Sequence, residues 1–183
     1  MKTTYIILII LSIFSFTHAQ TSNSSAFDDW RNIVLVSKVE GVNTSGFHFE
    51  YLQNRNTLWG DWLLPWAVSF QSTELHYKTF NKTDYRTASV AQLTVEVNGY
   101  KPLTNNLFLN LDGGVIIGNE KLTHFSGVYN ERVFIGLSLF QGILFVPDIN
   151  VPLVLKAGIY EEVLNSKLYN FDIGVKVGVG LKF

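Results

Sequence analysis

Phe171-Asp-Ile-Gly-Val-Lys-Val-Gly-Val-Gly-Leu-Lys-Phe183 alternates strictly between two kinds of residue. Its odd-numbered positions are all apolar, and its even-numbered positions carry aspartate, lysine or glycine. Alternate side chains of a β-strand point to opposite faces, so this segment predicts a strand with one apolar face and one polar face. The segment finishes on an aromatic residue, Phe183.

The same alternation recurs along the chain, with turn-rich stretches between the segments that show it. These segments are 32–41, 47–52, 66–71, 86–98, 107–117, 132–141 and 151–161. With the last segment they make eight, and most are near the roughly 9–11 residues that a tilted membrane strand needs. We therefore predict an all-β fold, a closed antiparallel up-and-down β-barrel of about eight transmembrane strands.

One segment can be interpreted in two ways. Asp112-Gly113-Gly114 is either a hairpin turn or the middle of a strand. A turn would leave two arms of about five residues, which are too short to cross a membrane. We favour one continuous strand.

A secreted, soluble β-barrel that carries a ligand is the main alternative fold, with its apolar face turned inward. Glycine on the polar faces favours the membrane barrel, because a narrow interior needs small residues between large ones. A water-facing strand surface gains nothing from glycine and loses β-propensity. The glycines concerned are Gly136, Gly158, Gly174, Gly178 and Gly180.

The beginning of the chain predicts secretion. A positive start at Lys2 precedes an apolar run over 5–16, and Thr17-His18-Ala19 supplies the small residues that a signal peptidase reads. We expect a signal peptide over 1–19, a polar lead-in over 20–31 and the barrel over 32–183. The chain has no cysteine, which excludes disulfides and thiolate chemistry. Its charge is nearly balanced, with a formal net charge of −1, so no nucleic-acid partner is expected.

The pattern and the terminal phenylalanine resemble the small, eight-stranded β-barrels of Gram-negative outer membranes, a family whose chains typically end in Phe as an assembly signal. The resemblance implies a monomer that crosses the outer membrane several times, with outer-membrane lipid and the barrel assembly machinery as partners. Phe183 would be the assembly signal. With both termini in the periplasm, the outward connections would be 43–45, 73–85, 118–130 and 162–170. The resemblance therefore implies a structural or surface-interaction role.

The polar faces predict a charged network inside the barrel. An eight-stranded barrel is only wide enough for side chains, and buried charges must be paired and hydrogen-bonded. We therefore expect a plug of ion pairs rather than an open pore. The residues placed there are Lys38, Glu40, His48, Glu50, Glu96, Asp112, Lys156, Lys176 and Lys182.

One short motif suggests an enzymatic alternative. His124-Phe125-Ser126 is similar to the H-x-S motif of outer-membrane lipid A deacylases, in which a His activates a Ser. Glu131 or Glu120 would have to orient the His, and Gly127 stands where those enzymes usually have asparagine. We expect no catalytic activity from these residues. Histidines and carboxylates do not show metal-ligand spacing in the sequence, so neither a metal site nor a cofactor is predicted.

Overall fold

The computed structural model describes residues 32–53, 58–76, 85–147 and 151–183, and the predicted signal peptide and lead-in lie outside this part. Eight long strands form the fold: β1 (Ile33–Gly41), β2 (Thr44–Gln53), β5 (Trp66–Leu75), β6 (Tyr85–Pro102), β7 (Leu107–His124), β8 (Tyr129–Phe145), β9 (Leu153–Leu164) and β10 (Phe171–Lys182). Two short strands, β3 (Leu58–Trp59) and β4 (Trp62–Leu63), make a small hairpin. Among the described residues no helix is long and apolar enough to cross a membrane.

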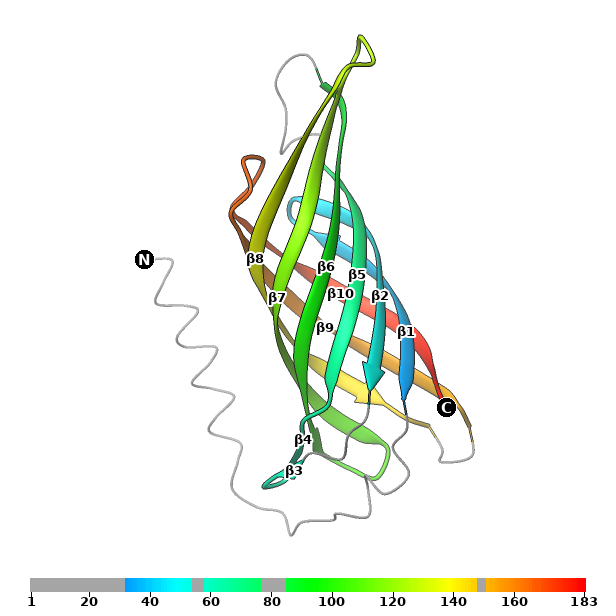
Figure 1. Cartoon of the computed structure of the whole chain (residues 1–183). Helices are drawn as coiled ribbons and strands as arrows, with labels where there is room; N and C mark the ends of the chain where they lie inside the picture. The colour runs from blue at the N-terminus through cyan, green and yellow to red at the C-terminus, as the bar shows by residue number, and fades with distance from the viewer. Residues whose placement is uncertain (1–31, 54–57, 77–84, 148–150) are drawn as a thin grey trace.

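The sheet closes on itself. The strand order is β6-β5-β2-β1-β10-β9-β8-β7, and β6 also pairs with β7, so every long strand has two antiparallel neighbours (Figure 1). The predicted closed eight-stranded barrel is confirmed. Strand β7 runs without a break through Asp112-Gly113-Gly114, which settles the ambiguity in favour of one strand.

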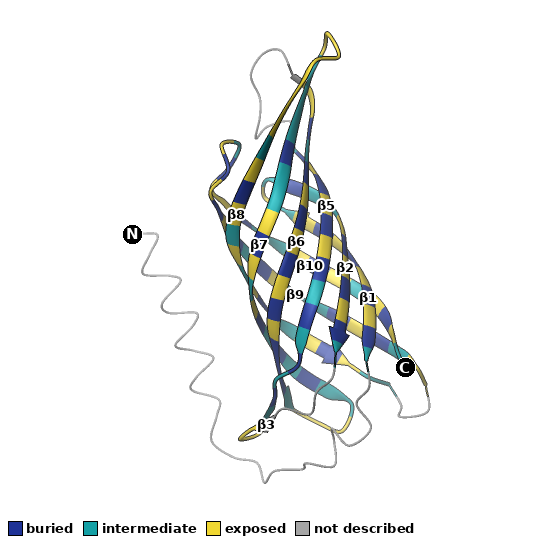
Figure 2. Ribbon diagram, viewed as in Figure 1, coloured by how far each residue is buried: buried dark blue, intermediate teal, exposed yellow. Residues whose placement is uncertain are grey.

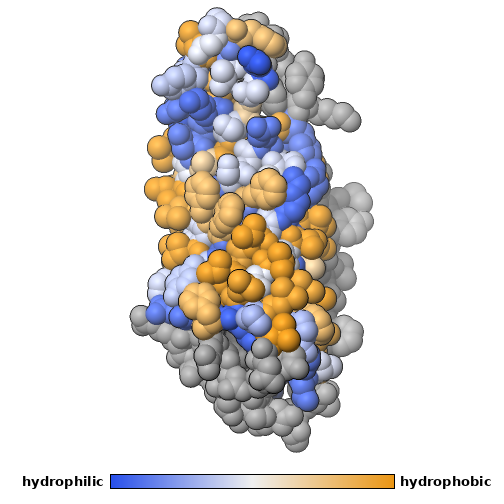
Figure 3. All heavy atoms as spheres, turned by 90° about the vertical axis from the view of Figure 1, so that its right-hand side faces the viewer, coloured by the Kyte–Doolittle hydropathy of each residue, from blue (hydrophilic) through white to orange (hydrophobic). Residues whose placement is uncertain are grey.

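The two faces of the wall are those that the alternation predicts. Along β10, Val175, Val177 and Val179 are exposed on the outside, while Lys176 is buried inside. Figure 2 shows the same alternation of buried and exposed residues along the other strands. The exposed apolar side chains gather in a belt over the lower part of the face in Figure 3, with hydrophilic residues above it. A soluble carrier would need the opposite orientation, with the apolar face lining the interior.

Three strands extend beyond the rest of the wall. The β8–β9 pairing stops at Gly136 opposite Leu164, whereas the β7–β8 pairing continues to Thr123 opposite Tyr129. Much of the predicted outer loop 118–130 is therefore strand, and the loop prediction is wrong there. Alternation fails as a guide in this region because both faces of the extension are polar or mixed.

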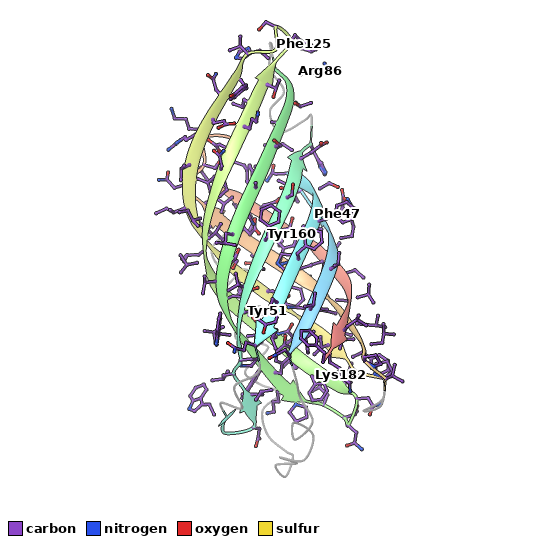
Figure 4. The ribbon with its side chains drawn as sticks, turned by 45° about the vertical axis from the view of Figure 1, so that its right-hand side comes forward. Phe47, Tyr51, Arg86, Phe125, Tyr160 and Lys182 are labelled. Carbon is purple, nitrogen blue, oxygen red and sulfur yellow. The ribbon has the colours of Figure 1, made fainter. Side chains whose placement is uncertain are left out.

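A tight turn joins β7 to β8 at the tip of this extension (Figure 4). The Gly127 N–H donates to the His124 carbonyl at 3.0 Å, and Gly127 has φ of +84°. This left-handed conformation favours glycine, as in hairpin turns that include a bulge.

Apolar side chains cross the interior at both ends. The cluster at the end that carries the C-terminus is called the lower plug here, and it contains Ile33, Leu35, Leu52, Leu63, Ala67, Tyr100, Phe108, Leu144 and Val154. The cluster near the extension is the upper plug, with Leu75, Ala88, Val90, Ile116, Phe134, Leu164 and Tyr169. Between the two plugs the interior contains mostly polar and charged residues, together with a smaller apolar cluster of Val39, Phe140 and Tyr160.

Candidate functional site: the charged interior of the barrel

Lys156 on β9 is the centre of the charged interior. Its ammonium lies 2.8 Å from Glu50 Oε2 on β2 and 2.8 Å from Asp112 Oδ2 on β7, and all three side chains are buried. The Phe140 ring on β8 packs against the same ammonium, with its centroid 4.7 Å away. One lysine therefore joins two carboxylates from distant strands across the barrel. Both of its hydrogen bonds are charge-assisted and short, as in strong ion pairs.

Two asparagines complete the hydrogen bonding of these carboxylates. The Asn98 amide donates to Glu50 Oε1 at 2.8 Å, and the Asn110 amide donates to Asp112 Oδ1. Asn98 also donates to the Tyr100 hydroxyl at 3.3 Å. Tyr100 is fully buried in the lower plug.

Two further carboxylates lie closer to the extension. Glu162 Oε1 accepts hydrogen bonds from Gln92 at 2.7 Å and Gln71 at 3.3 Å. Asp172 accepts from the Thr44 hydroxyl at 2.6 Å and the Tyr160 hydroxyl at 3.0 Å. Glu162 was expected in an outer loop, but β9 continues to Leu164 and turns the Glu162 side chain inward.

The upper plug includes a phenol that stays neutral. Tyr169 lies in the connection between β9 and β10 and is largely buried. Burial and the carboxylates nearby raise the pKa of Tyr169 above its ordinary value. Tyr169 therefore adds no negative charge to the interior, which already contains more carboxylates than lysines.

His48, Glu50 and Glu96 form a second cluster beside Lys156. One ligand atom of each side chain lies within 4.8 Å of the others, and all three residues are buried. Sequence spacing does not predict this cluster, because Glu96 comes from β6 and the other two residues come from β2. The spacing of His48 and Glu50, two positions apart on one strand face, was the available signal.

The structure corrects two of the predicted interior residues. Lys38 and Glu40 are exposed and lie on the outside of β1. Lys38 pairs with Val177 and Glu40 pairs with Val175, and directly opposed residues share a face. Both faces of β1 are apolar at its start, so its pattern alone does not fix which face turns inward.

On the outer surface, Lys38 and Glu40 form a polar group with neighbouring residues. The Lys38 ammonium donates to the Ser45 hydroxyl at 2.8 Å, and that hydroxyl donates to Glu40 Oε2 at 2.7 Å. Glu40 Oε1 also lies 3.3 Å from His76 Nε2. These charges lie where β1 turns into β2, at the border of the apolar belt.

The remaining predicted residues lie on the inner face. The Lys176 ammonium is 5.8 Å from the ring centroids of both Phe140 and Tyr160. Lys182 is partly buried at the lower end, opposite Ile33 of the lower plug. Figure 4 shows Tyr160 at mid-height and Lys182 at the end opposite the tip.

His124 and Ser126 lie at the tip of the extension, and the two candidate carboxylates have other partners. Glu131 lies 3.4 Å from Lys121, and Glu120 accepts hydrogen bonds from the Ser166 hydroxyl and the Lys167 N–H. A triad needs a carboxylate that orients the His. Each of the two candidate carboxylates contacts another residue, and the expectation that these residues have no catalytic activity stays a prediction.

Comparisons with known proteins agree on the fold. No family model and no curated protein matches the chain. Among solved structures, the chain is similar to Neisserial surface protein A, with a TM-score of 0.62, 13% identity, and coverage of 85% of this chain and 98% of that one. It is also similar to Ail, the attachment invasion locus protein of Yersinia pestis, with a TM-score of 0.52, 22% identity, and coverage of 84% and 97%. A further structure of Ail, in complex with the heparin analogue sucrose octasulfate, gives a TM-score of 0.51 at 21% identity, with coverage of 84% and 97%.

At these identities the similarity shows the fold alone. The fold is that of the small eight-stranded barrels of Gram-negative outer membranes, as the sequence pattern predicted. A closed barrel with an apolar outer belt is consistent with a multi-pass location in the outer membrane, because a closed sheet leaves no unpaired edge in lipid.

Proposed function

We propose that this protein is a monomeric outer-membrane barrel that conducts no solutes and acts at the cell surface through the extension formed by β6, β7 and β8. The observation that carries the proposal is the extension itself. It stands clear of the other strands at the end opposite the C-terminus, which in this reading is the end outside the cell (Figure 1).

The interior supports the absence of conduction. The charged layer around Lys156 lies between the upper and lower plugs, and each plug is made of large apolar side chains. An ion that entered from either side would have to displace these side chains and lose its hydration, which is costly in an apolar medium. The charged layer holds the strands together and is not a path.

The tip supports a role in surface interaction. Phe125, Val128 and Tyr129 are 72%, 61% and 55% exposed, respectively. Large apolar side chains that are exposed together mark interaction sites on protein surfaces. Lys121 lies over the Tyr129 ring at 4.0 Å to the centroid and adds a cation beside this group.

Two measurements test the proposal. The first is conductance of the purified barrel in a planar lipid bilayer, where we expect none above the bare membrane. The second is attachment of intact cells that display the protein to immobilised matrix proteins and sulfated polysaccharides. We expect the attachment to disappear when residues 121–131 are replaced by a two-residue turn.

A control variant and two opposing outcomes complete the conductance and attachment measurements. A Val177→Ile variant changes only the lipid-facing wall and should attach like the unchanged protein. Steady ionic conductance would contradict the sealed interior. Attachment that persists without the extension, or that is absent with it, would contradict the surface role.

A further inference from the structure

His48, Glu50 and Glu96 have the composition of a cation site and not only that of an ion-pair network. Their three ligand atoms lie within 4.8 Å of one another, inside the sealed part of the barrel. One imidazole nitrogen and two carboxylates are a ligand set that zinc and similar divalent transition metals accept.

The charge of this region is unbalanced. Lys156 neutralises only one of its two carboxylate partners, Glu50 and Asp112. Glu96 is the third carboxylate of this group, and Lys176, whose charge acts on both Glu50 and Glu96, is the second cation. Three negative and two positive formal charges leave −1. The imbalance extends through the described interior, where six carboxylate residues and two lysines are buried. Buried charges are normally paired or coordinate a metal, so a bound cation would offset the excess of negative charge in the interior.

Unpartnered polar atoms point to the same place. Both His48 and Glu96 are more than nine-tenths buried. Within them, His48 Nδ1 and Glu96 Oε1 make no hydrogen bond. The Ser69 hydroxyl, directly opposite Glu50 on β5, is also buried without a partner. A buried polar group without a partner normally requires an explanation such as an ion or an ordered water molecule.

Small residues are the cross-strand neighbours of the two carboxylates on β2 and β6. Strand β5 separates them, and it places Ser69 beside Glu50 and Ala67 beside Glu96. On the other side of Glu96, β7 places Gly114, where an added Cβ would lie 2.7 Å from the Glu96 Cβ. The residues directly opposite Glu96 on its two neighbouring strands are therefore an alanine and a glycine.

We propose that the interior of this barrel binds one divalent transition-metal ion of the zinc class, held by His48, Glu50 and Glu96. Lys156 donates to Glu50 Oε2 at 2.8 Å, and Asn98 fixes the same carboxylate with a hydrogen bond of 2.8 Å to Oε1. Such supporting contacts orient the ligands of metal sites. The ion enters during folding, since the two plugs close the finished barrel.

The experiment refolds the untagged barrel from urea into detergent, with zinc chloride present and with a chelator present instead. Unbound ion is removed by gel filtration, and the zinc content per chain is measured. We expect about one zinc ion per chain after refolding with zinc, and none after refolding with the chelator. Cobalt substituted for zinc should show the visible absorption of a site with nitrogen and oxygen ligands.

Matched variants locate the site. Glu96→Gln and His48→Gln remove one ligand each and should weaken zinc binding by at least about 10–100-fold. Glu162→Gln changes another buried carboxylate, and His76→Gln removes a surface histidine, so both should bind zinc like the unchanged protein. Heat-modifiable gel mobility verifies that every variant is folded.

Three outcomes would overturn the proposal. The first is a folded barrel that retains no zinc when refolded with it. The second is retention that Glu96→Gln and His48→Gln leave unchanged, which would place the ion at the surface. The third is equal loss in Glu162→Gln, which would mean that total interior charge, and not this set of ligands, holds the cation.

Discussion

Lys38 lies directly opposite Val177 across the seam where β1 and β10 close the barrel. Val177 is 58% exposed on the lipid-facing side, so the Lys38 side chain also points outward and reaches the Ser45 hydroxyl. This register separates two kinds of lysine in one molecule. Lys38 is a surface residue at the border of the apolar belt, whereas Lys156 is a buried partner of two carboxylates.

Replacing Lys156 should therefore destabilise the protein far more than replacing Lys38. Lys156→Met leaves Glu50 and Asp112 buried without their cation, and loss of one partner of a buried pair costs about 3–5 kcal/mol. Lys38→Met removes an exposed ion pair, which contributes about 0–1 kcal/mol. Urea unfolding in lipid vesicles, followed by gel mobility, measures both changes.

A compensating variant separates charge from packing at Lys156. If the uncompensated carboxylates cause the loss, adding Glu50→Gln and Asp112→Asn to Lys156→Met should recover much of the stability. No recovery would mean that the shape of the lysine side chain, and not its charge, holds these strands together.

The outer face of β6 offers a direct test of contact with lipid. Val95 is 55% exposed and lies between Val68 and Val115 on the neighbouring strands. Val95→Lys should lower the free energy of unfolding by about 2–4 kcal/mol, the cost of a lysine at the bilayer midplane. Val95→Ile is the control and should change it little. Equal tolerance of both variants would show that this face does not contact lipid.

Two adjacent glycines on β7 should respond oppositely to the same change. Gly113 points outward, and an added Cβ would meet no atom within 4 Å. Gly113→Ala should be neutral or stabilising by about 0.4–1 kcal/mol, because alanine restricts the unfolded chain. Gly114→Ala would press on Glu96 and should cost about 1–3 kcal/mol, the usual price of overpacking. The same unfolding assay compares them, and a reversed order would contradict the assigned faces.

Phe183 is predicted to act in assembly more than in stability. It is 59% exposed, and its N–H donates to the Asn32 carbonyl at 2.9 Å. Deleting Phe183 should lower the amount of folded protein in the outer membrane of cells. The same deletion should change unfolding of the refolded barrel in vitro by no more than one hydrogen bond, about 0.5–1.5 kcal/mol. Equal yields in cells would contradict a role as an assembly signal.

Local alternation was enough to predict the architecture of the wall. The 171–183 segment and its seven counterparts place apolar residues at every second position, and in a strand only one face can then be apolar. Their number, the glycines on their polar faces and the inward position of Lys156 and Lys176 follow from that period. The long extension was missed, because alternation weakens wherever neither face contacts lipid.

Tertiary structure alone decided which side chains meet inside the barrel. Closure sets the register of each pair of strands, and this register turns Lys38 outward, brings Lys156 between Glu50 and Asp112, and places Glu96 beside His48. Sequence by itself determined the faces of the strands whose alternation is clean, since alternation is a property of each strand alone, but not those of β1. The sequence did not determine these contacts, because the partners are far apart in the chain. Their distance depends on how the eight strands stagger when the sheet closes.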